Sequence, residues 1–282
     1  MQTAKNIMKV PITIDKDSPI YDAITAMHEK RISRLVVTEQ KKPIGIITEK
    51  DVGFFLFEDK TDRDIDEIPI SEAAKKMVFV NETTKIGDCA RMILEKDFSS
   101  LGVNSNGNIV GIITKTDLTK YYADTYTGKN HVGDFMTKSY VSSYLDEPVN
   151  KAVSKMLENK ISRIIIKNHD EIPVGIISFR DLFRLALDLG TEEFLEDNTR
   201  SDLSVIFSRK GFLSESGFGA ITTAAQIMTS GILSVLHSED LAKACKILLE
   251  NKVKGVGVLS ANGVLLGILT KTDVTHALSI AE

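Results

Sequence analysis

The chain has 282 residues, of which 43% are hydrophobic and 26% charged, and its formal net charge is −4. This length suits two ordinary domains or several smaller units, and the composition is that of a globular protein. The negative balance lacks the basic field of non-specific nucleic-acid binding, so no nucleic-acid partner is expected. No apolar run reaches about 18 residues and MQTAKNIMKVP has no long apolar core, so we expect a cytoplasmic protein without a membrane span or signal peptide.

The N-terminal stretch predicts the element order β-α-β-β-α. A short extended segment at 12–15 precedes Asp17-Ser18-Pro19, a good helix start, and apolar residues then recur at helical spacing over 20–27. Residues 34–37 form a β-rich run that ends in a turn. A second run at 44–48 leads into another helix through Val52, Phe55 and Leu56.

The same order returns three more times along the chain. A shift of 66 residues places 13–51 on 79–117 without a gap, and shifts of 129 to 130 and 221 to 222 bring in two further copies. One such unit leaves too much of its sheet uncovered to be stable alone, so we expect the units to pair through the sheet. The predicted segments are repeat 1 at 1–62, repeat 2 at 63–127, repeat 3 at 128–189, a linker at 190–221 and repeat 4 at 222–282.

Each repeat ends its second β-rich run with the same heptad, glycine, two aliphatics, a hydroxyl residue, two variable positions and an aspartate. The four copies are GIITEKD at 45–51, GIITKTD at 111–117, GIISFRD at 175–181 and GILTKTD at 267–273. A hydroxyl residue followed three positions later by an acid is a capping box, which needs no ligand. A capping box favours Glu or Gln at that place, whereas all four copies carry the shorter Asp, so a binding role stands beside the capping role.

Three elements in each repeat resemble the cystathionine-β-synthase (CBS) domain family, whose tandem pairs are called Bateman modules. They are openings such as NIMKVPITI, DFMTKSYVS and QIMTSGILS, central strands such as KRISRLVV and NKISRIII, and the heptad. The resemblance implies an α+β fold of four β-α-β-β-α repeats, paired into two Bateman modules that form a disc-like assembly, as in archaeal stand-alone CBS proteins and the γ subunit of AMP-activated protein kinase. It also implies adenosine ligands (AMP, ADP, ATP or S-adenosylmethionine) in clefts between paired repeats.

The heptad suits a nucleoside chemically. A carboxylate at a helix start can accept hydrogen bonds from both ribose hydroxyls, the preceding hydroxyl residue adds a donor, and the glycine lets the backbone approach a flat ring. The expected ribose-binding residues are Thr48, Asp51, Thr114, Asp117, Ser178, Asp181, Thr270 and Asp273. On the residues alone, ribose binding and helix capping both remain open.

Phosphate groups require cations, and here the repeats differ. The resemblance implies that Arg34 and Arg163 of the two ISR strands reach phosphates, the alternative being surface arginines paired with carboxylates. Repeat 2 has Ser100 at that place, and repeat 4 has Gly255 preceded by Lys254, which can act as a point charge.

A second set of ligand contacts is expected at the first strand. Thr13, Ser142 and Ser234 correspond to one another, whereas repeat 2 has the bulky Phe79. We therefore rank repeats 1 and 3 as best equipped, then repeat 4, with repeat 2 last.

Two lysines and the longer of two linkers leave alternatives open. Lys115 and Lys271 follow the heptad hydroxyl in the first turn of a helix, where a cation is unfavourable unless an anion is near, so a phosphate contact and a solvated lysine are both considered. Residues 57–70 are acidic and predict a solvated connection between repeats 1 and 2. The long join from Gly190 to Thr223, with Arg209-Lys210 and glycines at 211, 217 and 219, suits either a flap over a phosphate or a disordered connector.

Cysteines and histidines indicate no further chemistry. Cys89 and Cys245 are too few and too far apart for a disulfide framework or a metal cluster, and both fall in helical patterns, so we expect buried thiols in a reducing compartment. The five histidines share no repeat position and no metal-ligand spacing.

The sequence therefore predicts a regulatory protein rather than an enzyme. There is no P-loop, no nucleophile with a base at a recognisable spacing and no metal signature, and no cofactor is expected. The expected function is to bind adenine nucleotides and transmit the energy state of the cell to an unidentified regulated protein. The alternatives are an S-adenosylmethionine-binding regulator and a ligand-free structural adaptor whose heptads are only caps; a monomer and a homodimer both remain open.

Overall fold

The computed structural model describes residues 2–106, 108–188, 211 and 218–281. The chain divides into two compact units that each combine segments from distant parts of the sequence. Unit 1 contains residues 1–11, 77–140 and 232–282, and unit 2 contains 12–76 and 141–231. Unit 1 thus holds the main strands and long helices of repeats 2 and 4, and unit 2 holds those of repeats 1 and 3 together with residues 222–231 of repeat 4.

Every repeat builds the predicted β-α-β-β-α order after a short helical turn, and repeat 4 has one additional two-residue strand between the turn and this order. The elements of repeat 1 are α1 (Ala4–Ile7), β1 (Thr13–Asp15), α2 (Ile20–Glu29), β2 (Arg34–Glu39), β3 (Lys42–Thr48) and α3 (Glu49–Glu58). Those of repeat 2 are η1 (Ile70–Glu72), β4 (Phe79–Asn81), α4 (Ile86–Glu95), β5 (Ser100–Ser105), β6 (Asn108–Thr114) and α5 (Lys115–Thr125).

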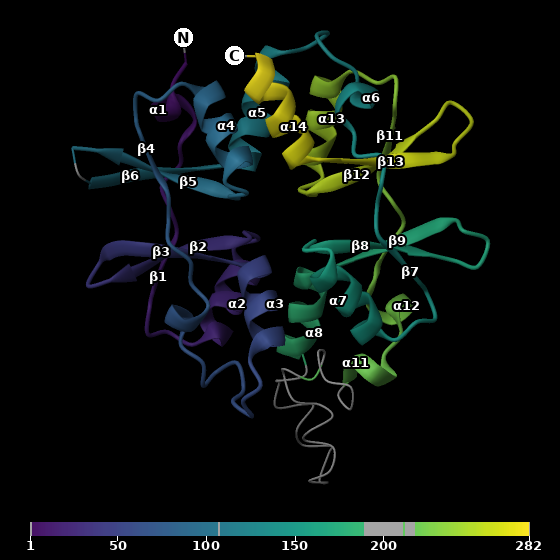
Figure 1. Cartoon of the computed structure of the whole chain (residues 1–282), viewed down its shortest axis with the longest axis horizontal. Helices are drawn as coiled ribbons and strands as arrows, with labels where there is room; N and C mark the ends of the chain where they lie inside the picture. Colours follow the sequence, from purple (N-terminus) through teal and green to yellow (C-terminus); the bar gives the residue numbers. More distant parts are fainter. Residues whose placement is uncertain (1, 107, 189–210, 212–217, 282) are drawn as a thin grey trace. The chain divides into compact units, whose positions relative to one another are not determined.

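Repeats 3 and 4 follow the same plan. Repeat 3 consists of α6 (Val132–Phe135), β7 (Ser142–Tyr144), α7 (Val149–Glu158), β8 (Arg163–Lys167), β9 (Pro173–Ser178) and α8 (Phe179–Asp188). The short helix α11 (Phe218–Ile221) lies at the end of the predicted linker, and repeat 4 consists of α12 (Ala224–Ile227), β10 (Thr229–Ser230), β11 (Ser234–Leu236), α13 (Leu241–Glu250), β12 (Gly255–Leu259), β13 (Leu265–Thr270) and α14 (Lys271–Ala281). In each repeat the two long helices lie beside the small sheet (Figure 1).

The sheets are small and mixed. The first strand of a repeat pairs in parallel with the second, and the second pairs antiparallel with the third. Repeats 1, 2 and 4 each form a three-stranded sheet. The sheet of repeat 3 gains β10 from repeat 4 as a fourth strand, which pairs antiparallel with β9. The heptad strand is therefore an edge strand that accepts a further segment of chain.

Helices from two repeats form the core of each unit. In unit 2 the buried faces of α2 and α3 pack with those of α7 and α8, and Val52, Leu182 and Met156 are fully buried there. In unit 1 the helices α4, α5, α13 and α14 do the same around Leu118, Leu248 and other buried residues. This helix-mediated packing of repeat 1 with 3, and of repeat 2 with 4, is a finding that the sequence analysis does not contain.

The first long helix of every repeat ends in the same turn. In repeat 1 the Ile32 amide donates to the Met27 carbonyl (3.0 Å) and the Arg31 amide to the His28 carbonyl (3.1 Å), with Arg31 at φ 52°. This is a Schellman motif, whose left-handed residue is usually glycine. The equivalent residues Asp97, Lys160 and Lys252 also have positive φ (49°, 53° and 53°). All four repeats thus place a side chain where glycine is favoured.

We expect Lys252→Gly to raise the free energy of unfolding by about 0.5 to 1 kcal/mol, because an L-residue is strained in this conformation whereas glycine is not. Urea denaturation measures the change. The control is Lys246→Gly at an exposed position inside α13, which should cost about 1 kcal/mol. Equal losses for the two variants would contradict the strain argument.

The connection between repeats 1 and 2 corrects one expectation. Residues 57–70 are predicted to be a solvated linker, yet Ile65, Ile68 and Ile70 are fully buried in the core of unit 2. The Ile68 and Ile65 carbonyls accept from the first amides of α2, those of Ile20 and Tyr21 (both 2.8 Å). Acidic side chains face outward between apolar residues that are spaced two or three positions apart. The prediction of a solvated linker was wrong because it considered only the charge of the segment.

Three further expectations concern burial, the membrane and the long join. Cys89 and Cys245 are buried as predicted, and burial raises the pKa of both thiols to about 12. Across the part of the chain that the structure describes, no helix combines the length and apolarity that a membrane crossing needs. Arg209, Lys210 and Gly217 lie outside the described residues, so the flap over a phosphate and the disordered connector both stay open as predictions.

Candidate functional site

The heptad is placed at a junction between strand and helix in all four repeats. In repeat 1, β3 ends at Thr48, whose extended backbone makes it the N-cap of α3. Asp51 Oδ2 accepts from the Thr48 amide (3.1 Å) and hydroxyl (2.5 Å), while the Asp51 amide donates to Thr48 Oγ1 (3.2 Å). This is a complete capping box, so one carboxylate oxygen of the heptad acid is used for helix capping.

The other three repeats repeat this geometry closely. Asp117 Oδ2 accepts from the Thr114 amide at 2.9 Å and hydroxyl at 2.6 Å. Asp181 Oδ2 accepts from Ser178, and Asp273 Oδ2 from Thr270, again through both amide and hydroxyl at 2.6 to 2.8 Å. The structure therefore brings together all eight predicted ribose-binding residues as four hydroxyl–acid pairs. It also shows that capping occupies one side of each acid.

The second oxygen of each acid contacts a residue from another repeat. Lys75 Nζ lies 2.7 Å from Asp51 Oδ1, and Lys9 Nζ lies 2.8 Å from Asp117 Oδ1. The Thr137 hydroxyl donates to Asp273 Oδ1 (2.8 Å), and the Thr229 hydroxyl donates to Asp181 Oδ1 (3.2 Å). Repeats 1 and 2 each supply the residue that contacts the heptad acid of the other, and repeats 3 and 4 do the same.

The partner residue ends what we call the opening segment of a repeat. The four opening segments, each a short helical turn and the two or three residues after it, are 4–9, 70–75, 132–137 and 224–229. Each segment makes an antiparallel bridge to the heptad strand of its tandem neighbour, for example between Lys75 and Ile46 or between Thr137 and Ile268. The paired amide–carbonyl bonds are 2.8 to 2.9 Å long in both examples. The backbone thus fixes the partner side chain over the acid.

The opening segment also explains the heptad glycine. A Cβ built on Gly267 would lie 2.3 Å from the Thr137 carbonyl oxygen, and one on Gly45 would lie 2.7 Å from the Lys75 carbonyl oxygen. At Gly111 and Gly175 the nearest atoms are the sulfurs of Met8 and Met228, at 2.7 and 2.5 Å. The close approach that the sequence analysis assigns to a flat ring is therefore made by protein atoms.

The predicted phosphate-binding arginines begin the central strands, opposite the heptad hydroxyl. Arg34 pairs with Thr48, and Arg163 pairs with Ser178. Arg34 also donates to Ser33 Oγ (3.4 Å). Burial lowers the pKa of Arg163 to about 10, an effect that Glu49 opposes and Arg180 reinforces. Arg163 thus faces charged groups of its own unit.

Glu49 and Arg180 form an ion pair that the sequence analysis missed. Arg180 Nε donates to Glu49 Oε1 (2.7 Å), and Arg180 Nη2 donates to the Ile32 carbonyl (2.9 Å). Glu49 is the first variable position of the heptad in repeat 1, and Arg180 is the second variable position of the heptad in repeat 3. The Glu49 carboxylate is almost completely buried.

The corresponding positions of repeats 2 and 4 form a different contact in unit 1. Lys115 Nζ donates to Thr272 Oγ1, and Lys271 Nζ donates to Thr116 Oγ1, both at 3.0 Å. The Lys254 carbonyl accepts from the Lys271 amide (3.2 Å). Two ammonium groups therefore lie at the starts of neighbouring helices, where they raise the local positive potential.

The first-strand residues lie apart from the heptad acid of their own repeat. Thr13, Ser142 and Ser234 pair with Val36, Ile165 and Gly257 of the second strand. The second strand separates them from the third, which carries the heptad. Two strand spacings amount to about 10 Å, so a first-strand hydroxyl and the heptad acid of one repeat do not touch.

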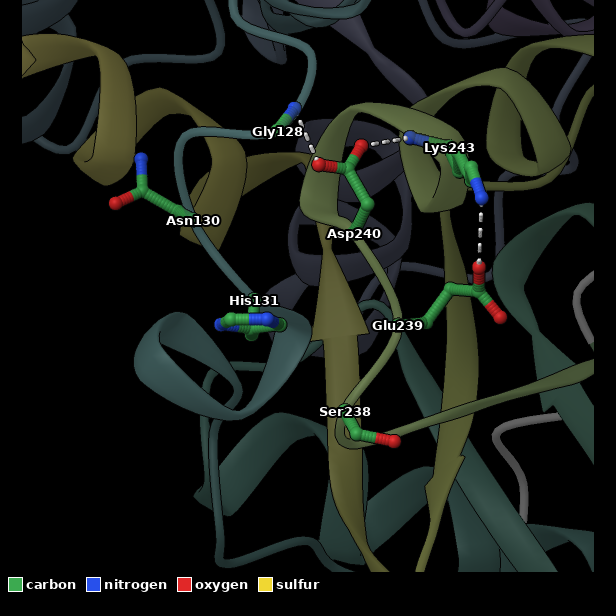
Figure 2. Close-up of a pocket in the computed structure, with 7 residues that line it drawn as sticks. All are labelled: Gly128, Asn130, His131, Ser238, Glu239, Asp240 and Lys243. Atoms are coloured by element: carbon green, nitrogen blue, oxygen red, sulfur yellow. Dashed lines mark hydrogen bonds and ion pairs between the residues drawn. The ribbon is translucent and has the colours of Figure 1, made fainter.

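A cavity of about 340 Å³ lies elsewhere, at the start of α13 (Figure 2). Its lining residues are Gly128, Asn130, His131, Ser238, Glu239, Asp240 and Lys243. Asp240 accepts there from the Gly128 amide (2.6 Å) and the Lys243 amide (2.9 Å). No heptad acid lines this cavity and its central carboxylate is paired, so the heptad acids remain the candidate site. Within the described residues, no group of three or more His, Cys, Asp and Glu could hold a metal ion.

Comparison with known proteins settles the family. The sequence pattern of the CBS domain matches residues 4–56, 65–124, 132–188 and 224–280, which together make up more than half of the chain. The chain belongs to the CBS domain family. The prediction of an α+β protein with four CBS repeats is confirmed.

Two relatives that match nearly the whole of this chain are known from an archaeon. MJ1225 of Methanocaldococcus jannaschii is 23% identical over 97% of this chain and 96% of its own length. Its crystal structure, described as that of a proposed archaeal homolog of g-AMPK, has a TM-score of 0.80 at 20% identity, covering 98% of this chain and 99% of that one. MJ1404 of the same organism is 24% identical over 97% of this chain and 61% of its own length. Both M. jannaschii proteins are described as uncharacterised, and the structural likeness to MJ1225 shows a common fold.

CBS repeats also match part of an enzyme. The homoserine O-acetyltransferase of Methanohalobium evestigatum is 31% identical over 107 residues, which is 38% of this chain and 21% of the enzyme. The likeness to that enzyme is thus limited to a small part of its length.

Proposed function

We propose that this CBS protein is a cytoplasmic regulatory protein that binds an adenine nucleotide (AMP, ADP or ATP) at its heptad acids and transmits ligand state to a partner protein. The observation that carries the proposal is the divided use of each acid. One oxygen caps a helix, and the other turns toward a side chain of the tandem neighbour. A ribose hydroxyl can take the place of that side chain without breaking the cap.

This arrangement supplies a means of regulation. The group that a ribose would displace belongs to the opening segment, which is also bonded to the heptad strand through its backbone. Ligand binding therefore changes how a segment of one repeat is fastened to its neighbour. A ligand that prefers one arrangement of this segment shifts the population toward it, which is the basis of allosteric coupling.

Three further points support an adenosine ligand. A buried or half-buried carboxylate forms charge-assisted hydrogen bonds of about 1.5 to 3 kcal/mol with hydroxyl donors. Basic side chains also surround the heptads in both units, Arg163 and Arg180 in unit 2 and Lys115 and Lys271 in unit 1. MJ1225, which shares the fold, is described as a proposed archaeal homolog of g-AMPK.

One observation favours a second candidate, the ligand-free adaptor. The capping boxes of repeats 1 and 2 are complete, the acids of repeats 3 and 4 accept from the amide and hydroxyl of their caps, and every heptad acid has a second partner, so the acids have a structural role without any ligand. Thermal unfolding with a nucleotide panel separates the two candidates. A ligand at about 100 times its dissociation constant stabilises the folded state by about 2.7 kcal/mol, whereas an adaptor does not respond.

We expect Asp51→Ala and Asp181→Ala each to weaken AMP binding at one site by about tenfold or more, because each loses charge-assisted bonds to the ribose. Isothermal titration calorimetry measures the affinity. Asp240→Ala is the matched control, since Asp240 caps α13 outside any heptad. It should lower stability by about 0.5 to 2 kcal/mol and leave AMP binding unchanged. If the heptad variants lose stability as the control does and keep their affinity, the acids are only caps.

A further inference from the structure

The second carboxylate oxygen of the heptad acid, Oδ1, has chemically different partners in repeats 1 and 2 than in repeats 3 and 4. We call these two sets of repeats the tandem pairs. Asp51 and Asp117 contact the ammonium groups of Lys75 and Lys9, whereas Asp181 and Asp273 contact the hydroxyls of Thr229 and Thr137. The four partner residues occupy equivalent places, because each forms the backbone bridge to the residue after the heptad glycine. The difference therefore lies in the side chains alone.

Each lysine ammonium group compensates the negative charge of the carboxylate that it contacts. The Asp117 side chain is 3% exposed and that of Asp51 10%, while the lysine side chains are 63% and 67% exposed. Each buried carboxylate is thus matched by one mobile, solvated cation on a flexible stem. Ion pairs with an exposed partner contribute little to stability, so a ligand can open them.

Opening such a pair has a different consequence for different ligands. A ribose hydroxyl of a neutral nucleoside would donate to the carboxylate oxygen in place of the ammonium group, which would then lack its counter-charge. A nucleotide brings a phosphate with it, and the released ammonium, still held near the site by its backbone bridge, can pair with that phosphate. The lysines thus disfavour binding of a nucleoside without phosphate and allow binding of a nucleotide.

The threonine contacts lack this opposition. A hydroxyl leaves the charge of its acid in place, and a ribose hydroxyl that replaces it makes an equivalent hydrogen bond. Among the described residues, neither Asp181 nor Asp273 has an ion pair comparable to those of Asp51 and Asp117. Neutral adenosine ligands meet no competing cation from the opening segment there.

We propose that Lys9 and Lys75 are specificity-determining residues, which make the sites of Asp117 and Asp51 selective for phosphorylated adenosine ligands, whereas the sites of Asp181 and Asp273 accept adenosine with or without phosphate. This inference rests on the proposed function. It goes further by dividing the ligand classes between the tandem pairs.

The experiment uses the full chain and two probes that differ only in the phosphate, AMP and adenosine. Native mass spectrometry counts the sites, and calorimetry gives the two affinities for the wild type, for Lys9→Thr/Lys75→Thr and for the reciprocal Thr137→Lys/Thr229→Lys. The preference for AMP over adenosine at the sites of Asp51 and Asp117 should fall by about tenfold in the first variant, the effect of one lost charge-assisted contact. The reciprocal variant should create such a preference at the other two sites.

Lys76→Thr is the matched control, because Lys76 is the exposed neighbour of Lys75 and lies one residue beyond the bridge. It should leave the ratio of the two affinities unchanged. AMP binding with the same ratio in the lysine variants overturns the inference and leaves the proposed function intact. A wild type that binds neither compound overturns both.

Discussion

Gly267→Ala is expected to lower the free energy of unfolding of unit 1 by about 2 to 3 kcal/mol, because the added methyl group has no room. Its Cβ would lie 2.3 Å from the Thr137 carbonyl oxygen and 3.0 Å from Lys138 Cα, which are backbone atoms. The opening segment would have to move away, which stretches two backbone hydrogen bonds of 2.9 Å between Thr137 and Ile268. Urea denaturation measures the total loss.

Hydrogen exchange tests the local part of this prediction. The Thr137 and Ile268 amides should exchange faster in Gly267→Ala, since both bonds lie in the bridge that the methyl group pushes apart. Val264→Ala is the control, because Val264 is 60% exposed in the same hairpin and its truncation should cost less than about 0.5 kcal/mol. Unchanged protection of the two amides would show that the segment accommodates the methyl group.

The repeats and the strand–helix junction could be predicted from the sequence because their signals are local. Helical spacing over 20–27, the β-rich runs and the four heptads each occupy a few consecutive residues, and the structure places α2, β2 and β3 where they are expected. The capping role of Thr48 and Asp51 follows from a spacing of three and is realised. Local chemistry thus fixed the position of the acid, while its second partner lay outside such reasoning.

The second partner could not be predicted because it depends on contacts between distant segments. Lys75 meets Asp51, and Thr137 meets Asp273, only because one repeat lays its opening segment on the sheet of another. A signal existed in the openings, where Met8, Met136 and Met228 are each followed by the partner residue. Without the bridge, this position is indistinguishable from an exposed residue before a strand.

The contacts of the variable heptad positions could not be predicted from the sequence either. Glu49, Lys115 and Phe179 differ in charge and size, and a pattern that compares repeats treats such positions as unconstrained. In the structure three pairs of these positions contact each other within one unit, namely Glu49 with Arg180 in unit 2, and Lys115 with Thr272 and Lys271 with Thr116 in unit 1. Variation between repeats therefore reflects complementarity between two helix starts.

Glu49→Ala is expected to destabilise unit 2 by about 3 kcal/mol, because it leaves cations without their counter-charge in a desolvated place. Glu49 Oε1 accepts from Arg180 Nε at 2.7 Å, and Glu49 is only 4% exposed. Its charge also opposes the burial that lowers the pKa of Arg163 to about 10, whereas Arg180 acts in the same direction as burial. Removing the carboxylate leaves two guanidinium groups that repel each other.

Two matched variants separate charge from packing. Glu58→Ala, at an exposed position of the same helix, should change stability by less than about 0.5 kcal/mol. The double variant Glu49→Ala/Arg180→Ala should recover part of the loss, since one of the two uncompensated cations is gone with the acid. Because Arg180 is the more exposed partner, we expect recovery of about 1 kcal/mol rather than the whole loss. Strictly additive losses in this cycle would mean that Glu49 acts through packing, and the pairing of variable heptad positions would then be geometric rather than electrostatic.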